Sequence, residues 1–247
     1  MIVGLGPGPA EWMTAEAGAA IAAASDLVGY GAYLDRLTPR PDQRVHASDN
    51  RAELDRARLA LGLAAQGRAV AVVSGGDPGV FAMAAAVFEA IEERPSWLDL
   101  EIAVAPGVTA MQAAAARLGA PLGHDFCAIS LSDNLKPWAI VERRLRAACE
   151  GDFVIALYNP ASRARPARIG EAFDLLRRLK AQATPVAFAR AVGRPDESLT
   201  LTTLAEADGA LADMATLVVV GSSETRFISR GGARAWMLTP RAYGSRR

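Results

Sequence analysis

Short apolar runs alternate along this chain with longer stretches in which apolar positions recur at the spacing of an α-helix. We predict strands at the apolar runs Ile2–Leu5, Leu27–Tyr30, Ala69–Ser74, Leu100–Ala105, Phe126–Leu131, Phe153–Tyr158, Val186–Ala191, Leu199–Thr202, Leu217–Gly221 and Ala235–Leu238. We predict helices at the periodic stretches Thr14–Ala24, Glu53–Gln66, Val80–Glu92, Val108–Leu118, Trp138–Cys149, Arg165–Leu179 and Leu204–Leu211. Strands that alternate with helices predict parallel sheets covered by helices, so the fold class is α/β.

The two halves of the chain differ in this pattern. The early strands are continuous apolar runs, which is typical of parallel strands that are buried on both faces. In the second half, Leu199–Thr202 follows Val186–Ala191 after a turn at Gly193–Pro195, with no helix between them. This arrangement predicts a hairpin, and therefore a mixed sheet in the second half.

A chain of 247 residues is long enough for two domains of ordinary size. The segment Leu118–Pro121 breaks the pattern near the middle, so we predict an N-terminal α/β domain over residues 1–118 and a C-terminal α/β domain over residues 119–247. Lys plus Arg and Asp plus Glu are balanced at 27 each, so no overall field attracts nucleic acid. No run approaches the ~18 apolar residues of a membrane-spanning helix, so we expect no membrane partner.

Cysteine and histidine are too sparse to indicate a metal site. The two cysteines, Cys127 and Cys149, form no CxxC pair, and His46 and His124 are the only histidines. The N-terminus begins with an apolar strand and lacks the basic segment of a secretion signal. We therefore expect a protein of the reducing cytoplasm that holds no metal of its own.

The most informative motif is the stretch from Val72 to Ala84, in which an apolar strand ends at two glycines, a carboxylate and a proline before a helix begins. Such turns lie at the carboxyl end of a parallel strand, where open α/β sheets bind ligands. Gly75 and Gly76 allow the backbone to approach a ligand closely. Asp77 argues against a phosphate and favours a cationic or hydroxyl-rich ligand. The alternative is that Asp77 only caps the following helix.

A second glycine-rich turn, Gly4-Leu-Gly-Pro-Gly-Pro9, follows the first strand. It invites a dinucleotide-binding interpretation, but the GxGxxG fingerprint needs a glycine where Pro9 stands. Pro7 and Pro9 also lack the backbone N–H groups that would hold a phosphate. Asp26 lies near the usual acidic offset, but it precedes its strand instead of ending it. A nucleotide-dependent oxidoreductase is therefore disfavoured, and an ordinary tight turn stays open.

Polar groups also follow several other predicted strands. Thr109 comes after Pro106-Gly107, where it either faces a ligand or caps a helix. A basic cluster, Arg163, Arg165 and Arg168, follows Tyr158-Asn-Pro160. Because cations oppose the dipole of a helix start, this cluster indicates an anionic ligand as strongly as it indicates a merely solvated helix start.

The strand near residue 128 has polar groups at both ends. His124 and Asp125 lead into it, and Ser130, Ser132 and Asp133 follow it, which is compatible with a polar wall of a site or with ordinary loop polarity. The chain contains no GxSxG nucleophile elbow, so no serine triad is predicted.

Taken together, the motifs resemble those of a known family. Gly4-Leu-Gly-Pro-Gly8, Gly75-Gly-Asp-Pro78, Pro106-Gly-Val-Thr109 and Pro185-Val-Ala187 resemble, in this order, the motifs of the tetrapyrrole (corrin/porphyrin) methylases, which use S-adenosylmethionine. The resemblance covers essentially the whole chain. The longer motifs resemble the group that methylates precorrin-3B, and these motifs are Gly29-Tyr30 with Tyr33-Leu34, Ser74–Phe81, Gly123–Phe126, Ile129–Asp133, Tyr158–Pro160 and Gly221–Arg226. The chain departs from this group in the segment Asp133–Pro137, where Asn134 and Lys136 stand in place of less polar or smaller residues.

The resemblance implies two αβα domains with a trough between them, a parallel N-terminal sheet and a mixed C-terminal sheet. It implies S-adenosylmethionine in a folded conformation at the domain junction, with S-adenosylhomocysteine as product. Carried over by motif, the cofactor-binding residues would be Pro7, Gly8, Gly75, Gly76, Asp77, Val80, Thr109, Ala110, Asn159, Ala187 and, less directly, Gly193.

The implied reaction is methylation of precorrin-3B at C17 with ring contraction to precorrin-4 in cobalamin biosynthesis, by a cytoplasmic homodimer. No catalytic residue is assigned, and the candidates are His124, Ser130, Ser132, Asp133 and Tyr158. Arg163, Arg165 and Arg168 are candidates for binding the carboxylates of the substrate. The alternatives are a methyltransferase of the same family that acts on another precorrin or on a cobalt-precorrin, and a non-catalytic binding module.

Overall fold

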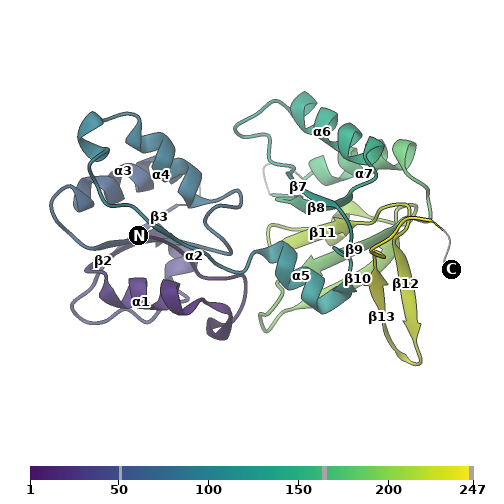
Figure 1. The fold of residues 1–247 in the computed structure, drawn as a ribbon, viewed down its shortest axis with the longest axis horizontal. Coiled ribbons are helices and arrows are strands. Elements are labelled where there is room, and N and C mark those ends of the chain that lie inside the picture. Colours follow the sequence, from purple (N-terminus) through teal and green to yellow (C-terminus); the bar gives the residue numbers. More distant parts are fainter. Residues whose placement is uncertain (50–51, 163–165, 245–247) are drawn as a thin grey trace. The chain divides into compact units, whose positions relative to one another are not determined.

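The computed structural model describes residues 1–49, 52–162 and 166–244. The chain divides into two compact units, Met1–Ala110 and Met111–Arg247 (Figure 1). The division lies at the start of helix α5 (Ala110–Leu118), whereas the predicted boundary lies at the end of that helix. The boundary at residue 118 thus stays a prediction.

The first unit is built on a parallel sheet, as predicted. Its strands are β1 (Ile2–Gly4), β2 (Asp26–Tyr30), β3 (Arg44–Ser48), β4 (Val70–Ser74) and β5 (Val104–Ala105). Their order is β3-β2-β4-β1-β5, and every pairing is parallel. The helices of this unit are α1 (Ala15–Ala23), α2 (Gly31–Leu34), α3 (Glu53–Ala64) and α4 (Met83–Ile91), with 3-10 turns at Ala10–Trp12 and Pro95–Trp97.

Side chains that alternate along the strands fill a core on each face of this sheet. Ile2 and Val72 pack in one cluster with residues of α3 and α4, whereas Val3 and Val73 pack in another cluster with residues of α1 and α2. Figure 1 shows α3 and α4 on one side of the strands and α1 on the other. Helix α1 begins where the Thr14 hydroxyl accepts a hydrogen bond from the backbone N–H of Ala17.

The second unit contains the predicted mixed sheet. Its strands are β7 (Phe126–Ser130), β8 (Val154–Tyr158), β9 (Pro185–Arg190), β10 (Ser198–Thr203) and β11 (Thr216–Val220). The order is β10-β9-β11-β8-β7, with β7 and β8 parallel and the other pairs antiparallel. The predicted hairpin is confirmed as β9 and β10. Helices α6 (Trp138–Glu150) and α7 (Arg168–Leu179) cover one face through a large apolar cluster.

A small third sheet, with the order β12-β13-β6, was not predicted. It joins β12 (Arg226–Arg230) and β13 (Ala233–Leu238) to the short β6 (Gly119–Ala120). Only the part of β13 that begins at Ala235 was expected. Polar residues interrupt β12, and β3 likewise reads Arg44-Val-His-Ala-Ser48, so neither strand shows a continuous apolar run.

One further prediction was confirmed only in part, and another was wrong. The predicted strand Leu100–Ala105 is reduced to β5, and the predicted helix Leu204–Leu211 is only a 3-10 turn at Gly209–Leu211. The N–H groups of Leu204 and Ala205 donate to carbonyls at residues 184 and 182, so this backbone bonds to a neighbouring loop instead of forming a helix. No helix in the described part of the chain is long and apolar enough to cross a membrane.

Candidate functional site

Three turns interlock at the carboxyl ends of β4, β1 and β5, which are neighbours in the first sheet. Gly6 and Gly76 each donate a backbone N–H to the other's carbonyl at 3.1 Å. The N–H of Leu5 donates to the carbonyl of Ser74 at 2.9 Å. The glycine motifs that the sequence indicated separately therefore form one continuous edge.

The glycines at this edge are required by the protein's own packing. A Cβ added to Gly107 would lie 2.2 Å from the carbonyl oxygen of Gly76, and one added to Gly4 would lie 2.7 Å from the same atom. A Cβ on Gly75 would lie 2.7 Å from the ring of Tyr33. At Gly75, the close approach that the sequence attributed to a ligand is made by the ring of Tyr33. Gly76 differs, because its φ is 67° and an added Cβ would meet its nearest neighbours only at 4.0 Å.

Asp77 joins two of the turns instead of capping a helix. Its carboxylate accepts a hydrogen bond from the backbone N–H of Gly79 at 2.8 Å and another from that of Gly107 at 3.0 Å. Helix α4 begins only at Met83, and no side chain caps it. The capping alternative is therefore wrong. A carboxylate has about four acceptor sites, so these two bonds leave capacity for a ligand.

Arg36 is a residue of this edge that the sequence motifs did not indicate. Its guanidinium donates to the carbonyl oxygens of Leu5, Gly6 and Gly8 at 3.2, 3.0 and 2.8 Å. The side chain follows helix α2 and thus fixes the first glycine turn from a segment about 30 residues away in the sequence. No local pattern marks it, because the partners are backbone atoms.

The turn after β4 contains an unusual backbone conformation. Phe81 has a φ of 53°, although its side chain is large, and the residue is 52% exposed. Such a residue is strained by about 1–3 kcal/mol, and this strain is most often found at functional sites. The neighbouring candidate Val80 is half-buried, whereas Thr109 is buried close to the Gly76 turn.

In the second unit, the parallel strands β7 and β8 end side by side. Ser130 is buried, and its hydroxyl accepts a hydrogen bond from the side-chain amide of Asn159 at 3.0 Å. Asn159 has a φ of 51°, a conformation that asparagine tolerates better than most residues. The Tyr158 hydroxyl accepts from the backbone N–H of Met111 at 3.1 Å. The structure thus brings Ser130, Tyr158 and Asn159 to one edge, as the motifs suggested.

Arg168 is engaged by carboxylates of the protein itself. It forms an ion pair with Asp133 at 2.6 Å and another with Glu171 at 2.7 Å, and its guanidinium lies 4.8 Å from the centre of the Trp138 ring. These contacts make Arg168 an anchor of the loop that contains Ser132 and Asp133. Arg163 and Arg165 lie outside the described residues.

Three candidates have different surroundings. His124 precedes β7, at the opposite end of that strand from Ser130, and its ring packs edge-on against Tyr243 with ring centres 4.6 Å apart. Ala187 lies within β9 and is fully buried, so it offers no surface to a ligand. Gly193, with a φ of 79°, lies in the turn after β9 and donates its N–H to Glu197 at 2.7 Å. Because β8 and β9 both run antiparallel to β11, this turn lies at the same edge as Tyr158.

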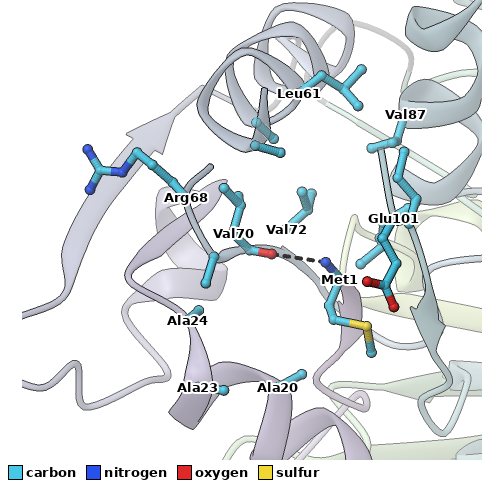
Figure 2. A pocket seen from close by; sticks show the side chains of 15 residues that line it. Met1, Ala20, Ala23, Ala24, Leu61, Arg68, Val70, Val72, Val87 and Glu101 are labelled. Atoms are coloured by element: carbon cyan, nitrogen blue, oxygen red, sulfur yellow. Dashed lines mark hydrogen bonds between the residues drawn. The ribbon is translucent and has the colours of Figure 1, made fainter. Parts of the chain in front are cut away.

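The opposite end of the first sheet contains a cavity of about 220 Å³, seen in Figure 2, which lies near the N-terminus and is lined by residues such as Val70 and Arg68. Asp26 begins β2 at this end and is fully buried. Burial alone would raise the pKa of Asp26, but hydrogen bonds from His46, Ser25 and Arg68 outweigh it and lower the pKa. The Asp26 carboxylate thus has a structural role, and it lies at the end of the sheet opposite to the glycine turns.

The fold and its two motif-bearing edges define a class of protein. Residues 1–208 match the family model of the tetrapyrrole (corrin/porphyrin) methylases, and the chain belongs to this family.

Its similarity to particular members extends along nearly the whole chain. It is 60% identical over 243 residues to the precorrin-3B C(17)-methyltransferase of a Sinorhizobium species, covering 98% of this chain and 96% of that protein. It is 49% identical over 246 residues to the cobalamin biosynthesis protein CobIJ of Mycobacterium bovis; the match covers 98% of this chain but only 48% of that protein. The crystal structure of the methyltransferase CobJ superposes with a TM-score of 0.93 at 50% identity, covering 97% of this chain and 98% of the other.

Proposed function

We propose that this protein transfers a methyl group from S-adenosylmethionine to C17 of precorrin-3B, with ring contraction to precorrin-4, in cobalamin biosynthesis. The observation that carries the proposal is the 60% identity, along nearly the full length of both chains, to the Sinorhizobium enzyme of that name. The motifs that resemble those of this group lie at the edges of both sheets.

The first unit has the chemistry to hold such a cofactor. Asp77 keeps acceptor capacity for a hydroxyl or ammonium group after its two bonds to backbone N–H groups. Pro7 and Pro9 remove donors that a phosphate would need, which favours a nucleoside without phosphates. In the first unit, the residues that we propose for holding it are Pro7, Gly8, Gly75, Gly76, Asp77, Val80, Thr109 and Ala110.

S-adenosylmethionine supplies an already activated methyl group when it is bound, so the tasks of the protein are positioning and the handling of protons. We propose that polar groups at the edge of β7 and β8 contact the macrocycle. These groups are Ser130, Ser132, Asp133 and Tyr158. Ser130 and Asn159 hold each other in place, which keeps both side chains in defined positions. His124, at the other end of β7, is the weakest of the candidates.

A single assay tests this function. Purified protein is incubated with S-adenosylmethionine and either precorrin-3B or its cobalt-loaded counterpart, and the mass and absorption spectrum of the product are measured. We expect one added methyl group and a contracted ring with precorrin-3B. Turnover of the cobalt form alone would assign the related cobalt-dependent reaction, and a copurifying NAD(P) with no methyl transfer would contradict the proposal.

We also propose that the protein works as a homodimer in the cytoplasm. Light scattering coupled to size exclusion measures the mass in solution and would contradict the dimer if it gave the mass of a single chain.

A further inference from the structure

The loop between β7 and α6, residues 131–137, is tethered at several points. The N–H of Leu131 donates to the carbonyl of Tyr158 at 2.9 Å, and the Lys136 ammonium donates to the carbonyl of Ser132 at 2.8 Å. Asp133 is held by its ion pair with Arg168. These contacts fix both arms of the loop, so the tip between them has a defined position.

The tip of this loop presents an apolar side chain to solvent. Leu135 is 98% exposed, more than any other large apolar residue in the described part of the chain, and the next is Leu98 at 69%. Single exposed apolar residues are common on protein surfaces. Leu135 differs because its loop is tethered on both sides and follows the strand end that carries Ser130, in the neighbourhood where α/β sheets bind their ligands.

We propose that Leu135 is a binding contact for the apolar body of the tetrapyrrole; this inference rests on the proposed function. A macrocycle offers a broad hydrocarbon surface between its polar substituents, and burial of a leucine against such a surface is favourable. Asp133 and Lys136 bond within the protein on either side of the tip, so the exposed apolar surface of this loop is the side chain of Leu135. Because the tethers set the position of the tip in advance, little conformational entropy is lost on binding.

The test compares L135A and L135M with L98A, a matched loss of an exposed leucine in the first unit. The KM for precorrin-3B, kcat and the Kd for S-adenosylmethionine are measured with the melting temperature. We expect L135A to raise the KM for the tetrapyrrole about tenfold, equivalent to ~1.4 kcal/mol, without change in cofactor Kd or melting temperature. L135M, which keeps an apolar side chain of similar volume, and L98A should behave as wild type.

Equal KM values for L135A and L98A in an active protein would overturn the inference. A change of association state in L135A with an unchanged KM would also overturn it, since the leucine would then contact a second copy of the chain. If the wild-type protein methylated neither form of the substrate, the proposed function itself would fail, and this outcome is seen before any variant is compared.

Discussion

The edges of the two sheets that bear the family motifs are held together by different kinds of contact. In the first unit, the turns after β1, β4 and β5 contact one another through backbone atoms, with Asp77 and Arg36 bound to backbone groups. In the second unit, the edge of β7 and β8 is a network of side chains that includes Ser130, Asn159 and the pair of Asp133 with Arg168. At the first edge, glycines allow the backbones of the turns to touch and two side chains bind backbone groups, whereas the second edge is held by bonds between side chains.

This difference predicts where a substitution should lower the stability of the fold and where it should mainly lower the rate of the reaction. A change at the interlocked turns has no room to relax, because close-packed backbone cannot move without shifting a strand. A change in the side-chain network removes hydrogen bonds or ion pairs but leaves the strands in place. The following substitutions test the contrast, beginning with the one that should have the largest effect.

Gly107→Ala should be the most damaging. The added Cβ would lie 2.2 Å from the carbonyl of Gly76, so the turns must separate. We expect a loss of about 3 kcal/mol in the free energy of unfolding, measured by urea denaturation, and loss of cofactor binding by calorimetry. Gly62→Ala is the matched control: no neighbouring atom lies within 4 Å, and the change should stabilise α3 by up to ~1 kcal/mol. Equal stability of the two variants would refute interlocking as the reason for the glycine.

Asp77→Ala should weaken cofactor binding and also destabilise the first unit. As a ligand contact alone, Asp77 would affect only cofactor binding, but its carboxylate also accepts two hydrogen bonds from backbone N–H groups that the variant would lose. We expect a loss of about 2 kcal/mol in stability and at least a tenfold rise in the Kd for S-adenosylmethionine by calorimetry. Asp42→Ala, at an exposed ion pair, should change neither. Unchanged cofactor affinity with a normal melting curve would remove Asp77 from the site.

Arg36→Met should loosen the first glycine turn without disturbing the core. Three carbonyl groups lose their donor, and we expect a loss of about 1.5 kcal/mol in stability with weaker cofactor binding. The comparison is Arg58→Met, in which an exposed pair with Glu93 is removed and stability should change by less than ~0.5 kcal/mol. If both variants bound the cofactor as wild type does, Arg36 would be structural only.

Ser130→Ala should have the smallest effect on stability and a larger one on the reaction. The variant loses the two hydrogen bonds that the Ser130 hydroxyl accepts, one from the side-chain amide of Asn159 and one from the backbone N–H of Ser132, for which we expect about 1 kcal/mol in total. If this edge positions the macrocycle, the methyl-transfer rate should fall by more than stability explains, while the cofactor Kd is unchanged. Ser229→Ala, at an exposed position of β12, serves as control. A stability loss as large as that of Gly107→Ala would remove the distinction between the two edges.

Local patterns predicted most of the elements but not the contacts between them. The strand, turn and helix around Gly75 are visible because apolar runs and glycine conformations are properties of short segments. The β9–β10 hairpin was also correctly predicted, because no helix separates its two strands. The polar strands β3 and β12 and the 3-10 turn at Gly209 depend on neighbours distant in the sequence, so periodicity alone did not indicate them.

The same division holds for the candidate site. The sequence by itself determined that glycines and polar groups follow the strands, and that their order resembles the tetrapyrrole methylases, because these are features of composition and spacing. Only the tertiary structure decided what several of them do. The placement of β1 between β4 and β5 brings Gly4, Gly76 and Gly107 into contact and gives the Asp77 carboxylate a backbone partner 30 residues away. A non-local strand order of this kind cannot be derived from any single segment.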